Sequence, residues 1–157
     1  MNLETLMSDV DWPHMTRDLK QSDEIYMLCP VRKATPEEKE FLEAYKQEMA
    51  IRGFRAHYPA TDTNQEADLG GYRICMNHCE EEERAAQIHI FWNTSSTGSY
   101  VDLGTCLYLH RKVGKKIKVI NRKEVEKTVS DHETKGIPKS YEHVILYLDN
   151  LAGKKKS

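Results

Sequence analysis

Short apolar runs, each bounded by turn residues, alternate along this chain with longer amphipathic segments. The runs are too short for helices of ordinary length, so each of them predicts a buried strand. They cover residues 25–31, 54–58, 87–92 and 116–121. The third run is apolar at nearly every position, which is typical of a strand covered on both faces.

The segments between the runs carry helix signals. Thr35 is a candidate N-cap, Pro36 suits the first helical position, and Gly53 lies where a helix C-terminus is expected. Further helices are predicted over residues 72–86, 99–113 and 140–151. Residues 122–137 are charged and are predicted to be irregular.

This alternation predicts an α/β fold. We expect one doubly wound, Rossmann- or flavodoxin-like domain with a mainly parallel sheet of about four to five strands. The domain is assigned to residues 24–151, after an N-terminal extension (residues 1–23) and before a basic tail (residues 152–157). Sites in such sheets lie beyond the carboxyl ends of the strands, so three loops are expected to meet there. These loops are residues 29–33, 58–71 and 93–99.

Composition narrows the classes of partner. The 157 residues carry a formal net charge of −2, so a broad basic surface for a nucleic-acid duplex is not expected. No apolar run is long enough to cross a membrane, and the N-terminus lacks a signal-peptide pattern, so a cytoplasmic location is predicted. The four cysteines are expected to be reduced thiols in that compartment.

Three potential metal ligands share one face of the predicted helix over residues 72–86. They are Cys75, His78 and Cys79. The set lacks a second ligand pair and the close cysteine spacing of zinc ribbons, so we favour partly buried thiols and predict no metal site. Glu80 to Glu83 are interpreted as the solvated face of this helix.

The segment Ser96–Gly104 carries the most informative chemistry, because a strand ends and a helix begins there. With Ser99 as N-cap, Asp102 becomes the third helical residue of a capping box, which is an ordinary stabilising role. The same position also favours an ionised carboxylate, which serves as a nucleophile or stabilises positive charge at a sugar carbon. Ser96 and Gly98, with Ser99, form either an ordinary turn or a cradle for phosphate or ribose.

The other candidates follow the predicted strands. Arg32 is either a surface residue or a bidentate phosphate ligand. Tyr26 is expected in the core, with its hydroxyl near the strand end, and Asn93 lies beside a strand. The backbone of the first loop, including Cys29, Pro30 and Val31, is a candidate clamp for the same phosphate.

Taken together, these residues resemble the nucleoside 2-deoxyribosyltransferase-like superfamily, which includes nucleoside 5′-monophosphate N-glycoside hydrolases. The resemblance covers about residues 24–121 and rests on three segments. Cys29–Arg32 is similar to the end of the family's first strand, and Ala85–Ile90 is similar to its third strand. Ser96–Gly104 is similar to the signature that carries the catalytic carboxylate before Leu-Gly.

The resemblance implies roles by position. Asp102 would be the catalytic carboxylate, Ser96 and Ser99 would contact the substrate, and Tyr26 and Arg32 match a tyrosine and an arginine of some monophosphate hydrolases. The chain departs from the pattern twice, because the family usually has Glu at position 102 and an Asp at position 79, where this chain has Cys79. No cofactor is expected, and a homo-oligomer is implied.

The predicted function is therefore cleavage of the N-glycosidic bond of a nucleoside or nucleoside 5′-monophosphate, by hydrolysis or deoxyribosyl transfer. Two other functions stay open at this point. One is a non-catalytic sensor of a nucleotide or NAD-derived ligand on the same scaffold. The other is an interaction protein that acts through its N-terminal extension and the charged residues 122–139.

Overall fold

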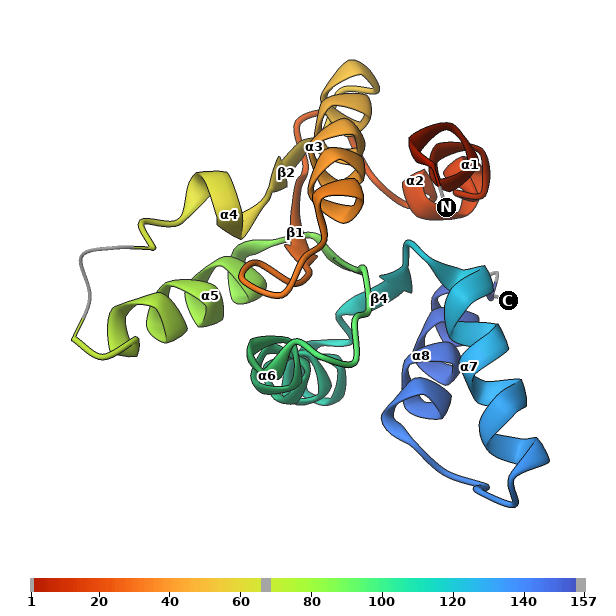
Figure 1. The fold of residues 1–157 in the computed structure, drawn as a ribbon. Coiled ribbons are helices and arrows are strands. Elements are labelled where there is room, and N and C mark those ends of the chain that lie inside the picture. The colour runs from red at the N-terminus through yellow and green to blue at the C-terminus, as the bar shows by residue number, and fades with distance from the viewer. Residues whose placement is uncertain (1, 66–68, 155–157) are drawn as a thin grey trace.

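A computed structural model describes residues 2–65 and 69–154, and Figure 1 shows its α/β architecture. Four parallel strands form the sheet in the order β2-β1-β3-β4, with helices packed against it, which confirms the predicted fold class. The strands are β1 (Glu24–Leu28), β2 (Arg55–His57), β3 (Gln87–Ile90) and β4 (Lys116–Val119). Each strand is shorter than the apolar run that predicted it, because the last residues of each run turn away as loops.

The strand order places a switch point between β1 and β3. The chain leaves β1 toward β2 on one side and then returns to add β3 on the other side. In the register of this pair, Leu28 lies opposite Ile90, and the Phe91 backbone N–H donates to the Leu28 carbonyl at 2.9 Å. The loops that follow β1 and β3 therefore begin side by side, which is where doubly wound sheets bind ligands.

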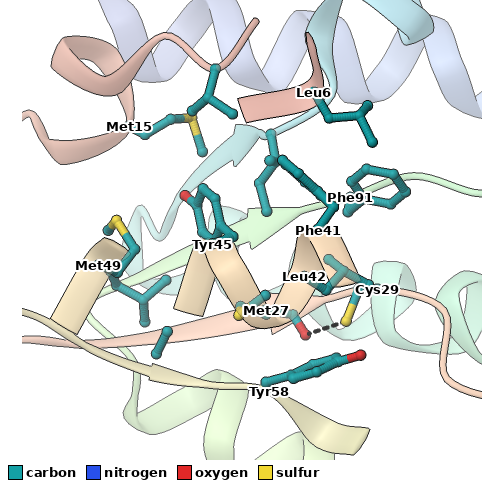
Figure 2. Packing of buried hydrophobic residues seen from close by; sticks show 14 of the residues in the cluster. Leu6, Met15, Met27, Cys29, Phe41, Leu42, Tyr45, Met49, Tyr58 and Phe91 are labelled. Carbon is teal, nitrogen blue, oxygen red and sulfur yellow. Dashed lines mark hydrogen bonds between the residues drawn. The ribbon is translucent and has the colours of Figure 1, made fainter. Parts of the chain in front are cut away.

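Eight helices are present in the described residues. Their bounds are α1 (Leu3–Ser8), α2 (Trp12–Thr16), α3 (Pro36–Ile51), α4 (Pro59–Asp62), α5 (Tyr72–Arg84), α6 (Thr97–Val113), α7 (Arg122–Thr134) and α8 (Tyr141–Gly153). One hydrophobic cluster packs α1, α2 and α3 against the sheet, and Figure 2 shows part of it. A second cluster contains the buried side chains of α6 and α8, with Tyr26 and Leu28 of β1. Alternate residues of β1 thus face the two clusters, as expected of a strand buried on both sides.

Helix α3 follows its sequence signals closely. Thr35 Oγ1 accepts from the Glu38 N–H at 3.1 Å, and Glu38 Oε1 accepts from the Thr35 N–H at 3.0 Å, so the predicted N-cap is confirmed as a capping box. Gly53 follows the helix at φ +98°, and a Cβ there would lie 2.0 Å from the side chain of Gln21. The helix therefore ends at a position that only glycine occupies without strain.

The prediction that residues 122–137 are irregular was wrong, because α7 forms over most of this segment. Val125 is buried against the second cluster, and the Arg122 guanidinium bonds Glu126 one turn later at 2.6 Å. Charged pairs at this spacing support a helix whose apolar stripe is narrow. The stripe was too narrow for sequence periodicity to detect.

The segment assigned as an N-terminal extension contributes to the same core. Leu6, Val10 and Met15 are buried in the first cluster, and Figure 2 shows Leu6 and Met15 beside Tyr45 of α3. The Arg17 carbonyl accepts from the buried Lys118 ammonium of β4 at 2.7 Å. Residues 155–157 of the predicted basic tail lie outside the described residues. Within 2–65 and 69–154, no helix combines the length and apolarity that a membrane span needs.

Candidate functional site

A cavity of about 830 Å³ lies at the carboxyl edge of the sheet, beyond the switch point between β1 and β3. All three loops that were predicted to meet contribute to it, together with α5 and α6. The lining residues are Cys29, Val31, Arg32, Lys33, Gln65, Gly70, Gly71, Ile74, Cys75, His78, Ser96, Thr97, Gly98, Ser99 and Asp102. The volume is in the range of cavities that bind small molecules such as nucleotides.

The sequence placed Asp102 in the first turn of its helix, and this prediction was wrong by one turn. Helix α6 begins at Thr97 with Ser96 as N-cap, and no acidic residue lies in its first turn. Ser99 is helical: its N–H donates to the Ser96 carbonyl at 3.2 Å, and its hydroxyl donates to the Ser96 hydroxyl at 2.8 Å. Because Asp102 does not serve in a capping box, its carboxylate is available for another role.

The Asp102 carboxylate forms part of the cavity wall, and the residue is 8% exposed. The Tyr26 hydroxyl donates to Asp102 Oδ2 at 2.9 Å, and His78 Nδ1 lies 3.4 Å from the same oxygen. In the described part of the chain, both contacts fall on Oδ2, which leaves Oδ1 without a hydrogen-bond donor. The carboxylate is therefore held by one oxygen while the other is available to react.

Tyr26 supports Asp102 from behind and does not line the cavity. Its side chain is fully buried in β1, where the ring stacks on His57 with centroids 5.7 Å apart. Burial raises the pKa of the Tyr26 phenol well above its ordinary value, and the charge of Asp102 raises it further. The phenol therefore stays neutral and acts as a fixed hydrogen-bond donor to the carboxylate.

A second acid, Glu82 of α5, lies buried near this pair. The sequence interpreted Glu80 to Glu83 as a solvated face, and for Glu82 this was wrong, because its exposure is 0%. Burial raises the pKa of Glu82 to about 9, and the nearby charge of Asp102 contributes to the shift. The Cys106 thiol donates to Glu82 Oε1 at 3.2 Å. Glu82 is thus neutral at physiological pH and adds no second negative charge beside Asp102.

The structure brings most of the predicted site residues together. Cys29, Val31, Arg32, Ser96, Gly98, Ser99 and Asp102 all line the one cavity. Pro30 is not among the lining residues, and burial raises the pKa of the Cys29 thiol, which keeps it neutral. Asn93 lies outside the cavity, where its amide donates to Glu38 Oε1 at 3.2 Å and its Oδ1 accepts from the Ser95 N–H. Asn93 thus fastens the loop to α3.

Helix α5 supplies the residues that sequence reasoning did not assign to the site. Ile74 and His78 line the cavity, and Glu82 continues the same face at a spacing of four residues. The signal was this spacing, which aligns the three side chains on one stripe of the helix. Gly70 and Gly71 bring the start of α5 to the cavity with positive φ angles of +64° and +97°.

The rim of the cavity carries positive charge. Arg32 and Lys33 line it from the loop after β1, and the N-terminal turn of α6 faces the same space. Backbone N–H groups at a helix start and nearby cations attract anions such as phosphate. Among the described residues, no group of three His, Cys, Asp or Glu side chains could hold a metal ion.

Comparisons with known proteins found no match: no protein-family model, no curated protein and no solved structure is significantly similar to this chain.

Proposed function

We propose that the cavity binds a nucleoside or a nucleoside 5′-monophosphate and that the protein cleaves its N-glycosidic bond, by hydrolysis or by deoxyribosyl transfer. The observation that carries the proposal is the Asp102 carboxylate. It lies at the wall of a cavity that is large enough for a nucleotide, with Oδ2 bonded to Tyr26 and Oδ1 left without a donor.

Cleavage at a sugar anomeric carbon passes through an oxocarbenium-like transition state. A fixed carboxylate lowers the energy of that state by its charge, or attacks C1′ to form a glycosyl ester. Asp102 Oδ1 is the atom for this role, because the bond from the Tyr26 phenol holds the group in place through Oδ2. Holding the carboxylate before the substrate arrives avoids the entropic cost of orienting it during the reaction.

The rest of the cavity suits the other parts of a nucleotide. Arg32 and Lys33, together with the hydroxyls at the start of α6, form a region that attracts a phosphate. Val31 and Ile74 offer apolar surface to a base. These contacts favour a monophosphate over a free nucleoside. A homo-oligomer, which the family resemblance implies, stays a prediction.

The test is to incubate the purified protein with a panel of nucleoside and deoxynucleoside monophosphates and to detect released base by chromatography. The Asp102→Asn variant is expected to release no base while its affinity for the ligand stays nearly the same. Asp131→Asn, which changes an exposed aspartate of α7, is the matched control. Unchanged turnover by the Asp102 variant would remove this residue from the mechanism.

A non-catalytic sensor of the same ligands is the second candidate. It is favoured by the short reach of the aspartate, which is one methylene shorter than a glutamate and is only 8% exposed. A misplacement of about 1 Å can lower a rate by about 100-fold. Thermal stabilisation by a nucleoside monophosphate, with no release of base over long incubation, would support the sensor and not the enzyme.

A further inference from the structure

His78 is the unassigned residue of the cavity. It projects from the middle of α5 and lines the cavity, and its side chain is 13% exposed. Nδ1 lies 3.4 Å from Asp102 Oδ2, and the imidazole ring is tilted against the ring of Tyr26, with centroids 5.9 Å apart. Nε2 is buried and has no hydrogen-bond partner. A buried polar atom without a partner costs about 1–3 kcal/mol, so this one calls for an explanation.

The contact with Asp102 determines which imidazole nitrogen exchanges a proton. A carboxylate beside Nδ1 favours a proton on Nδ1, so Nε2 becomes the nitrogen that gains and loses the mobile proton. Aspartate orients the imidazole of hydrolytic triads in the same way. Geometry in an empty site is often looser than in the complex, so the unpaired Nε2 is compatible with a bond made to a ligand.

The other cavity-lining groups are poor proton donors at neutral pH. The guanidinium of Arg32 and the ammonium of Lys33 are far too basic to release protons readily. Burial raises the pKa of the Cys29 thiol. Among the described lining residues, His78 carries the one imidazole, and histidine is the side chain that ordinarily titrates between about pH 5 and 8.

Building on the proposed function, we propose that His78 is the general acid that protonates the leaving base. As the C1′–N bond breaks, its electron pair goes to the base nitrogen, which takes the proton from Nε2 of the imidazolium. Asp102 Oδ1 meanwhile forms the C1′–O bond of a glycosyl ester. In the second step a water gives one proton to the neutral imidazole, and its oxygen attacks C1′. The ester bond breaks with its electron pair returning to the carboxylate, so both residues are restored.

The experiment compares two substrates that differ in how much their leaving group needs a proton. One is a nucleoside 5′-monophosphate, and the other is 4-nitrophenyl β-ribofuranoside 5-phosphate, whose phenolate leaves without protonation. The His78→Gln variant is expected to lose at least about 100-fold in kcat/KM on the nucleotide and to stay within about threefold of wild type on the aryl glycoside. Asp102→Asn is expected to lose both activities.

His78→Asn and His110→Gln complete the set. The first keeps a hydrogen-bonding nitrogen near Asp102 but cannot titrate, so it replaces the glutamine variant if that variant does not fold. The second changes a histidine of α6 that lies outside the cavity, where Nδ1 bonds the Lys115 carbonyl at 3.1 Å, and it is expected to behave as wild type. Thermal unfolding of each variant verifies that it is folded.

The outcomes separate this inference from the function on which it rests. Equal losses of the His78 variants on both substrates would show a structural role and would overturn the assignment as general acid. Full activity of these variants on the nucleotide would overturn it as well, and that comparison needs no aryl substrate. A wild-type protein that cleaves neither substrate contradicts the proposed function itself.

Discussion

Replacing Glu82 by glutamine isolates the effect of one buried acid on stability. Glutamine has nearly the same shape, and its Oε1 can still accept from the Cys106 thiol as Glu82 Oε1 does. The other oxygen, Oε2, is buried and has no partner in the described structure, so an amide nitrogen there breaks no existing bond. The substitution therefore removes a titrating proton and leaves the packing largely intact.

The magnitude follows from the pKa of Glu82, which rises from its ordinary 4.5 to about 9 in the folded protein because the side chain is buried near Asp102. Between these values the folded state binds more protons than the unfolded chain, so the free energy of unfolding falls as pH rises. One pH unit within this window corresponds to about 1.4 kcal/mol, and about pH 5 to 8 corresponds to about 4 kcal/mol. Glutamine does not titrate, so the Glu82→Gln variant lacks this loss.

The assay is urea unfolding of both proteins at several pH values between about 5 and 8. The stability of the variant relative to wild type is expected to increase steadily with pH, whatever constant offset the substitution adds. Glu83→Gln, which changes the exposed neighbouring glutamate, is the control and should show no such trend. A difference that stays flat across the range would refute the reasoning, because it would mean that Glu82 is ionised in the folded protein.

Three further predictions test other parts of the structure. Tyr26→Phe removes the donor to Asp102 Oδ2 and should lower kcat for base release by about tenfold or more while KM changes little, as steady-state kinetics would show. Burial lowers the pKa of Lys118 from 10.5 to about 8, so between these values the unfolded chain binds more protons. Wild-type stability should therefore rise by about 1 kcal/mol per pH unit there relative to Lys118→Met, in denaturant unfolding at alkaline pH. Thr35→Ala breaks the capping box of α3 and should cost about 1 kcal/mol in urea unfolding, and a cost near zero would contradict the importance of the cap.

The helix signals of α3 and the apolar runs were sufficient to predict the layered fold. A capping box and a glycine at positive φ act through hydrogen bonds and backbone sterics within a few residues, so Thr35 and Gly53 indicate helix ends in any context. The alternation of strands and helices also predicted where the loops converge. These features depend on short-range interactions that a single sequence carries in full.

Local signals were ambiguous where two residues competed for one role. Ser96 and Ser99 are both suitable N-caps, and the choice of Ser99 placed Asp102 one turn too early in its helix. The packing of the loop after β3 decides between them, because it buries both serines and turns the Ser99 hydroxyl toward Ser96. The nature of Asp102 as a candidate was legible in the sequence, whereas its position on the cavity wall was not.

The sequence by itself determined the order of strands and helices, the edge of the sheet where a site forms, and the acid most suited to act there. Only the tertiary structure decided the protonation states and partners at that site. Tyr26, His78 and Glu82 come from a different strand and helix, and their contacts with Asp102 span separations that no local pattern reports. Helix periodicity depends on neighbours in the chain, but desolvation and charge depend on neighbours in space.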